Sequence, residues 1–231
     1  MLLDYLYTAL HKAHVDGTPI LNPLWYKYPA DKATFTIDLQ FFFGPSLLVS
    51  PVTEESKTSV QIYLPNDLFY DFATLQAVKG HAQTITLENI GFTDIPLHIR
   101  GGAVLPLRLN GSMTTKALRG IDFELVVAPG LDGKAAGELY VDDGESLKQT
   151  GVTEVKMTYE NGKLAVRGIW GFETDVNVGR VRIAAVKKNP ERVKLSGWDL
   201  DRRKWKWDSQ TEVLSVAVDV RFNVDFDLVF V

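Results

Sequence analysis

Asp142 and Asp143, followed by Glu145, are adjacent carboxylates that could do acid–base chemistry. Two neighbouring acids can hold different pKa values and share the work of a general acid and a general base. The same Asp-Asp-Gly-Glu-Ser sequence also suits a tight turn, because an Asp side chain accepts backbone N–H groups and Gly144 tolerates positive φ. We therefore predict a turn here. Calcium ligation is a minor alternative, although the spacing does not match an EF-hand loop.

Aromatic side chains could do a second kind of chemistry, which is stacking on a sugar ring. Trp205 and Trp207 alternate along the chain, so in a strand they share one face. If that face is exposed, the pair is a candidate carbohydrate-binding site, which Trp198, Trp25 and Tyr70 could extend. If it is buried, the pair belongs to a core, and the usual burial of aromatic residues favours the core.

Three further residue types bear on function. Asn110-Gly111-Ser112 is an acceptor sequence for N-linked glycosylation in a polar stretch, so Asn110 is a candidate modification site. The four histidines have no acidic partners at ligand spacing, and cysteine is absent. We therefore expect no metal site and no cofactor, and the isolated serines have no histidine partner that would indicate a triad.

Composition excludes several classes of partner. The net charge of −4 and the lack of a long Lys/Arg block argue against nucleic-acid binding. No run approaches the ~20 apolar residues that a membrane span needs. Met1 to Asp4 lack the basic start and apolar core of a signal peptide. The 231 residues suffice for one large β domain or two small ones.

The elements that would position these residues begin with a helix. Leu3, Leu6 and Leu10 recur at helical spacing and predict an amphipathic helix over residues 1–15, which Gly17 ends. No capping residue precedes it, which suggests that the helix is part of a larger element and that the chain is a fragment.

Short apolar runs separated by Pro, Gly and Asn predict strands for the rest of the chain. One buried strand is expected over residues 20–28, and a strand or short helix over 34–44. The other expected strands are residues 47–52, 59–64, 68–72, 83–87, 95–100, 103–108, 122–127, 137–142, 154–160, 163–170, 180–185, 193–195, 213–218 and 226–231. A polar stretch at 110–120 separates two groups of strands, and Asn161-Gly162 predicts a type I′ hairpin turn.

Residues 95–106 carry the most specific pattern, in which Gly101-Gly102 separates two apolar runs. Consecutive glycines there predict a backbone bend between two strands. We expect Arg100 to fix the bend by pairing with an acid or with backbone carbonyls.

Taken with residues 22–31 (NPLWYKYPAD), 43–52 (FGPSLLVSPV) and 140–146 (YVDDGES), this pattern resembles the C-terminal third of a retaining α-glucosidase of glycoside hydrolase family 31. The resemblance implies a mainly β fold. It assigns residues 1–42 to the last helix and strand of a (β/α)8 barrel, residues 43–120 to a proximal C-terminal β-domain, and residues 121–231 to a distal β-sandwich.

The resemblance also implies an activity, the hydrolysis of terminal α-linked glucose with retention of configuration. That chemistry uses two carboxyl groups about 5–5.5 Å apart. In the family both lie upstream of the region that this chain resembles, so the implied role is non-catalytic: this part, or small subunit, completes and stabilises the catalytic barrel. The implied partner is an N-terminal catalytic chain, joined by cleavage into a heterodimer and supplying contact with the α-glucoside. The implied location is the secretory pathway.

Two alternatives stay open from the sequence. One is a free-standing β-sandwich that binds carbohydrate through Trp205 and Trp207. The other keeps the scaffold but serves an α-xylosidase or a transglucosylase. The positions that distinguish these activities belong to the barrel loops of the family and not to these residues.

Overall fold

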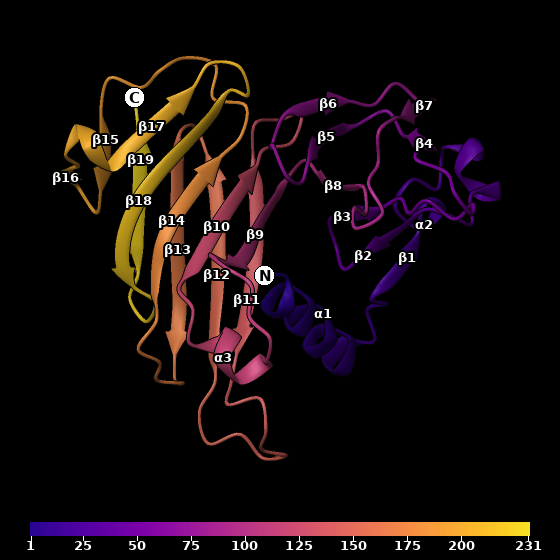
Figure 1. Ribbon diagram of the computed structural model, residues 1–231. Helices are drawn as coiled ribbons and strands as arrows, with labels where there is room; N and C mark the ends of the chain where they lie inside the picture. Colours follow the sequence, from indigo (N-terminus) through magenta and orange to yellow (C-terminus); the bar gives the residue numbers. More distant parts are fainter.

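The computed structural model describes residues 1–231 and is built mainly of strands, which form one large and two small sheets (Figure 1). Helix α1 (Leu3–Asp16) lies between the body of the large sheet and a smaller body that holds the other two sheets. The shorter helices are α2 (Leu24–Lys27), η1 (Lys32–Thr36), α3 (Thr115–Arg119) and η2 (Arg202–Lys204). None of these helices has the length and apolar character needed to cross a bilayer.

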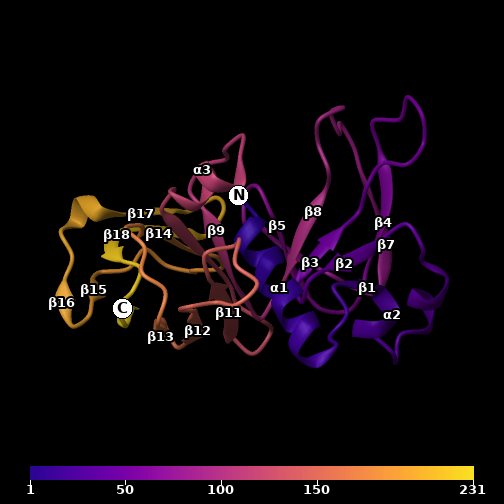
Figure 2. The same cartoon turned by 90° about the horizontal axis from the view of Figure 1, so that it is seen from below.

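The large sheet has eleven strands and curls so that its halves face each other (Figure 2). Because β9 pairs with both β10 and β11, the two halves are one continuous sheet rather than two separate layers. The strand order is β16 (Trp198–Asp199), β15 (Val193–Leu195), β19 (Phe226–Phe230), β13 (Lys163–Trp170), β12 (Thr153–Glu160), β11 (Ala135–Val141), β9 (Ala103–Arg108), β10 (Phe123–Ala128), β14 (Asn177–Ile183), β18 (Val213–Arg221) and β17 (Trp205–Asp208).

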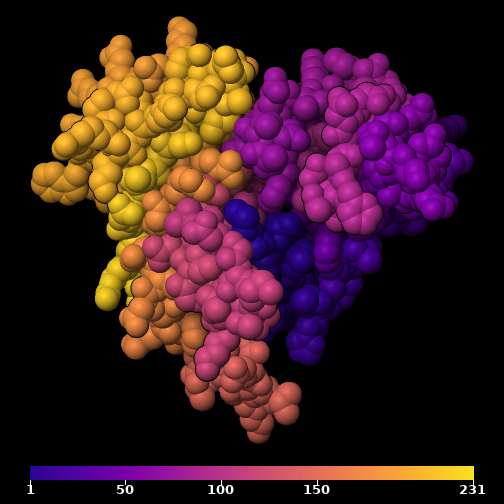
Figure 3. All heavy atoms as spheres, viewed as in Figure 1, coloured from indigo at the N-terminus to yellow at the C-terminus, as the bar shows by residue number.

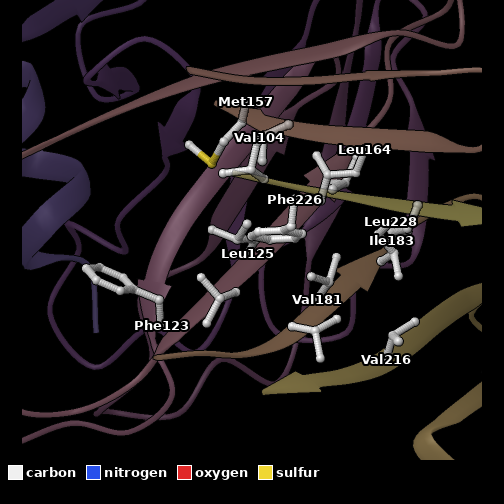
Figure 4. Close-up of a cluster of buried hydrophobic side chains, with 14 of the residues drawn as sticks. Val104, Phe123, Leu125, Met157, Leu164, Val181, Ile183, Val216, Phe226 and Leu228 are labelled. Atoms are coloured by element: carbon white, nitrogen blue, oxygen red, sulfur yellow. The ribbon is translucent and has the colours of Figure 1, made fainter. Parts of the chain in front are cut away.

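The main core fills the space inside the curl. Alternate residues of the strands point inward, as in the pattern of β12, where every second residue from Thr153 onward is buried. Figure 4 shows side chains from both halves meeting there, with Leu125 and Val181 on one side and Met157 and Leu164 on the other. This alternation explains why strands such as β12 in the second half of the chain could be predicted from the two-residue repeat of their apolar side chains.

The smaller body consists of a six-stranded sheet and a two-stranded ribbon. The sheet order is β1 (Leu21–Pro23), β2 (Phe41–Phe43), β3 (Leu47–Val49), β8 (Leu97–Arg100), β5 (Leu68–Asp71) and β6 (Ala77–Lys79), and the ribbon pairs β4 (Val60–Leu64) with β7 (Gln83–Leu87). A small core that includes Phe42, Leu48 and Phe69 lies within it.

The Gly101-Gly102 bend is the connection between the two bodies. It follows β8 of the six-stranded sheet and precedes β9 of the large one. Gly102 has φ of +93°, and a Cβ on Gly101 would lie 2.9 Å from the carbonyl oxygen of Pro129. The expected bend is confirmed, and so is the pairing of Arg100, whose Nε donates to Asp67 at 2.8 Å.

Other local predictions had mixed outcomes. The helix and its end at Gly17, where φ is +76°, are confirmed, as is the Asn161-Gly162 turn with positive φ at both residues. The single strand expected over residues 20–28 is wrong after Pro23, because Leu24–Lys27 form a helical turn. Leu24 is buried there while the next two side chains are exposed. An apolar run as short as this one does not allow a buried strand to be distinguished from a helical turn by sequence alone.

The predicted domain divisions at residues 42 and 120 stay predictions. In this fold β9 lies in the large sheet, although it precedes residue 120, and the polar stretch at 110–120 contains α3. The stretch therefore lies between two paired strands of one sheet.

A buried ion pair joins α1 to the large sheet. Arg108, 2% exposed, donates from Nε and Nη2 to the two carboxylate oxygens of Asp4 at 2.8 and 2.7 Å. Its Nη1 donates to the carbonyls of Arg119 and Ile121, and its guanidinium lies 3.7 Å from the ring centre of Phe123. Asp4 also lies in the first turn of α1, where a negative charge is favoured.

We predict that Asp4→Asn lowers the free energy of unfolding by about 3 kcal/mol, because it leaves the Arg108 guanidinium buried without its counter-ion. Urea denaturation measures the loss. The matched control is Lys12→Gln, whose partner Glu138 lies 3.7 Å away with both side chains about half exposed. We expect the control to cost under about 1 kcal/mol. Equal losses in the two variants would contradict the assigned role of the buried pair.

A second prediction concerns His98, which is 3% exposed and whose Nδ1 has no partner. Burial lowers its pKa, while Asp71 has a smaller, opposite effect. As the pH falls below about 6.5, the unfolded chain takes up a proton that the folded chain does not, so stability falls until the lowered pKa is reached.

The effect is bounded by about 1.4 kcal/mol per pH unit for one proton. Urea midpoints between pH 7.5 and 5 should therefore fall less steeply in His98→Gln than in the wild type. His81→Gln, at an exposed position, should leave the slope unchanged. A wild-type slope retained in His98→Gln would show that His98 is not the group responsible.

Candidate functional site: the exposed face of helix α1

Helix α1 has one face fixed to its own chain. Its buried residues are Asp4 and Tyr5, and it packs on β9 and β11. The Tyr5 hydroxyl donates to the carbonyl of Phe43 and accepts the N–H of Ser46, both at 2.9 Å. Gly44 allows this approach, because a Cβ there would lie 2.7 Å from the Tyr5 hydroxyl. The helix is therefore held to both bodies of the molecule.

The opposite face of α1 borders an apolar groove. The groove has a volume of about 370 Å³, and every residue that lines it is hydrophobic: Leu3, Leu6, Tyr7, Leu10, Ile20, Leu21 and Phe43. Leu10 and Leu21 are 51% and 59% exposed. Figure 3 shows α1, in indigo, reaching the surface between the two bodies. Such a groove has no polar group to orient a sugar, so its chemistry suits an apolar partner surface.

Exposed hydrophobic side chains continue beyond the groove along the sequence. Seven large ones lie within residues 10–39, namely Leu10, Val15, Leu21, Trp25, Tyr26, Phe35 and Leu39. Single exposed apolar residues are normal, but a concentration in one segment indicates a contact surface. We call the groove together with these seven side chains the α1 surface.

A hydrogen-bonded cluster fixes Tyr7 at the edge of the groove. The Tyr7 hydroxyl donates to Asp142, 2.9 Å from either carboxylate oxygen, and Arg119 donates to the Asp142 carbonyl at 2.6 Å. The backbone N–H of Gly144 also donates to Asp142. Gly144 has φ of +72°, and a Cβ there would meet the Arg119 side chain at 2.2 Å. The β11–β12 loop is thus joined to α1 at its base.

The electrostatics of this cluster favour a structural role. Burial raises the pKa of Tyr140 to about 12, and Asp142 adds to the effect. Burial and then Asp142 also raise the pKa of Tyr7. Both phenols therefore keep their protons at neutral pH, and Tyr7 acts as a donor to a carboxylate. His11 stacks on Tyr140 with ring centres 3.6 Å apart, which adds a further contact between α1 and β11.

The carboxylates singled out in the sequence are separated by this arrangement. Asp142 is 3% exposed and bonded to α1, whereas Asp143 accepts the backbone N–H groups of Glu145 and Ser146. A hydrogen bond from the Ser146 hydroxyl, together with those from the backbone N–H groups, lowers the pKa of Asp143. The predicted turn is confirmed, and the two acids do not form an acid–base pair. No three histidine or acidic side chains gather as metal ligands would.

The two tryptophans predicted to share a face do so on the inner side of the large sheet. Trp205 is 5% exposed and belongs to the main core, with the Arg202 guanidinium 3.8 Å from its ring centre. Trp207 is partly buried against the same core and donates from Nε1 to the carbonyl of Val186 at 2.7 Å. Trp205 has little exposed area and Trp207 is only partly exposed, and carbohydrate binding at this pair stays a prediction.

Asn110 lies in an exposed bend between β9 and α3, which leaves its side chain accessible. Of the features described above, sequence reasoning anticipated the apolar stripe of α1 but missed its anchors. The signals for them were an arginine inside the apolar run Leu107–Leu109 and an aspartate at the start of an apolar helix. The arginine and the aspartate lie 104 positions apart in the sequence, so neither residue by itself indicated that the two would pair.

Comparisons with known proteins match this chain to one family. Residues 17–105 match the family described as the glycosyl hydrolase family 31 C-terminal domain. The probable alpha/beta-glucosidase agdC of Neosartorya fischeri is 51% identical over 182 residues, or 79% of this chain and 21% of that protein. The alpha-glucosidase of Schizosaccharomyces pombe is 34% identical over 220 residues, or 94% of this chain and 22% of that protein.

Solved structures extend the match to the whole fold. A glucosidase II alpha subunit superimposes with a TM-score of 0.83 at 30% identity, covering 100% of this chain and 28% of that one. A Flavobacterium johnsoniae family 31 dextranase gives 0.82 at 25% identity, covering 99% and 31%. This chain therefore spans about a fifth to a third of each of these relatives, and it has the sequence and fold of the C-terminal region of glycoside hydrolase family 31 proteins.

Proposed function

We propose that this region completes and stabilises the catalytic barrel of a retaining α-glucosidase and supplies no catalytic residue itself. The observation that carries the proposal is the α1 surface, which is apolar, partly hollow and held rigidly from behind. Burying each large apolar side chain of such a surface contributes roughly 1.5–3 kcal/mol. The seven exposed hydrophobic side chains between Leu10 and Leu39 are therefore sufficient to hold a partner domain.

The proposed division of labour follows from the two faces of α1. Residues 1–42 would form the last helix and strand of a (β/α)8 barrel, with the α1 surface against the remaining barrel elements. Residues 43–120 and 121–231 would be the proximal and distal β-domains behind it. The anchors at Asp4 and Tyr5 then keep α1 at a fixed position relative to both bodies, so the barrel would close on a preformed surface.

The names of the relatives support the substrate class. The matched proteins include probable alpha/beta-glucosidases and an alpha-glucosidase, all several times longer than this region. We propose terminal α-linked glucose as the substrate of the complete enzyme and the N-terminal catalytic part as the partner. A glucosidase II catalytic subunit is known in a heterodimer with a regulatory subunit, which shows that one such protein assembles with a second chain.

The alternatives have less support. An α-xylosidase or a transglucosylase would use the same scaffold, and no residue of this region favours either. A free-standing carbohydrate-binding module would need an accessible aromatic platform, whereas Trp205 and Trp207 lie at the inner face of the large sheet.

We predict that this chain alone does not turn over nitrophenyl α-glucoside and that it does so when combined with the N-terminal catalytic part. Leu10→Asp or Leu21→Asp should weaken that association at least tenfold, because each places a charge in the apolar groove. Isothermal titration calorimetry measures the affinity, and the glucoside assay measures activity.

The matched control is Ile169→Asp, which changes an apolar residue on β13 of the large sheet that is even more exposed, at 72%. It should leave both the affinity and the activity unchanged. Turnover by the chain alone would disprove the non-catalytic role. An Ile169→Asp variant that associates as weakly as Leu10→Asp would show that the α1 surface is not the contact.

We also propose that the protein passes through the secretory pathway and carries a glycan on Asn110. Expression in a fungal host behind a secretion signal should give a mass above that of the polypeptide, and Asn110→Gln and Ser112→Ala should each remove the excess. Intact mass spectrometry before and after deglycosylation reads this directly. A wild-type mass equal to that of the polypeptide would disprove the modification.

A further inference from the structure

A buried carboxylate on the outer face of the large sheet holds two arginines side by side. Glu124 of β10 is 0% exposed. Its Oε1 accepts Nε of Arg180 at 2.5 Å and Nε of Arg182 at 2.7 Å, and its Oε2 accepts Nη2 of Arg182 at 3.1 Å. Both arginines come from the neighbouring strand β14. One carboxylate thus fixes the position of two guanidinium groups.

The charges in this cluster do not balance. A single arginine would neutralise Glu124, so the second guanidinium leaves one positive charge in excess. Lys206 of β17 makes no ion pair, but its charge acts on Asp208 two residues along the same strand, so the excess at this patch comes from the arginine pair. Asp219 of β18 is paired with Lys204 at 2.7 Å. The whole protein carries a net charge of −4, so this positive patch is a local exception.

The register of the strands shows which small residues lie beside the arginines on this face of the sheet. Ser215 of β18 lies between Arg182 and Lys206 in one row across three strands. Ala217 lies beside Arg180 in the next row. Both arginine side chains reach Glu124 on β10, which lies on the opposite side of β14 from Ser215 and Lys206, so the guanidinium pair and not Lys206 forms the centre of the patch.

The outer face is distinct from the core. Side chains alternate along β14 and β18, so Val181, Ile183 and Val216 point inward, as Figure 4 shows, while the arginines point the other way. The Arg180 and Arg182 side chains are 43% and 21% exposed. The patch is therefore open to a ligand from solution.

Several N–H donors of the two arginines make no hydrogen bond within the protein. Both terminal amino groups of Arg180 and the Nη1 group of Arg182 have no acceptor within the protein. None of these amino groups is a buried polar group without a hydrogen-bond partner, because the atoms of that kind belong to Asn22, His98 and Gln149. Two guanidinium groups held in place with free N–H groups are a prearranged fork for oxygen acceptors.

We propose that Arg180 and Arg182, held side by side by Glu124, form a binding site for a small oxyanion group: a sulfate, a phosphate or a carboxylate. The buried Glu124 holds the guanidinium groups together against their mutual repulsion, which lowers the ordering cost of binding. The site uses no residue of the α1 surface, so it stands independently of the proposed glucosidase role.

The test is titration of the intact chain with sodium sulfate, and separately with sodium phosphate, against sodium chloride at equal ionic strength. Calorimetry should show saturable binding of sulfate or phosphate that chloride does not reproduce. Arg180→Gln should weaken it at least tenfold. Arg180→Lys keeps the charge but loses the fork, and should weaken binding by a smaller factor.

The matched control is Arg167→Gln, at a side chain 47% exposed whose guanidinium is paired with Asp227. It should bind the anion as the wild type does. Lys206→Gln, at an exposed position two strands from β14, removes a nearby charge without touching the guanidinium pair and should also bind the anion as the wild type does. Equal responses to chloride and sulfate, or unchanged affinity in Arg180→Gln, would overturn the proposal.

Two further titrants identify the source of the oxyanion. Glucose 6-sulfate and glucuronate present the group on a sugar, whereas the inorganic salts present it alone. Tighter binding of the sugar-borne group than of inorganic sulfate would support an anionic saccharide as the ligand. Tighter binding of the inorganic ion would support a free anion, and either result supports the site itself.

Discussion

A buried arginine determines how the rest of this molecule is arranged. Arg108 lies in the large sheet with almost no solvent contact, and a charge in that position needs a partner. Asp4 supplies it from the first turn of α1, so detaching the helix from the sheet would leave the Arg108 guanidinium without its counter-ion. With that face fixed, the leucines on the other side of α1 face outward. The apolar groove is therefore a consequence of the ion pair as well as of the helical pattern.

The two bodies of the fold are joined by elements that leave little freedom. The chain crosses between sheets at Gly101-Gly102, where a side chain on Gly101 would collide with the backbone at Pro129. Tyr5 reaches from α1 into the smaller body at Phe43, and Tyr7 holds the β11–β12 loop through Asp142. These contacts fix α1 between the two bodies, which suits the proposed role of presenting one surface to a catalytic barrel.

Much of this fold was readable from the sequence, and the failures have physical reasons. Alternation predicted strands such as β12 and β13, and the Asn161-Gly162 pair predicted their turn, because both signals are local. The helical turn after Pro23 was missed, since a segment as short as Leu24–Lys27 fits either structure. The partners of Arg108 and the sharing of Glu124 by two arginines depend on pairings far apart in the chain, which no local pattern encodes.

In the proposed complete enzyme, the catalytic barrel covers the α1 surface. Hydrogen–deuterium exchange of this chain, alone and combined with the N-terminal catalytic part, tests this coverage directly. Backbone amides of residues 3–39 should exchange more slowly in the combined protein, while those of the β15–β16 hairpin at the far edge of the large sheet should not change. Unchanged exchange over residues 3–39, with slowing elsewhere, would contradict the central claim.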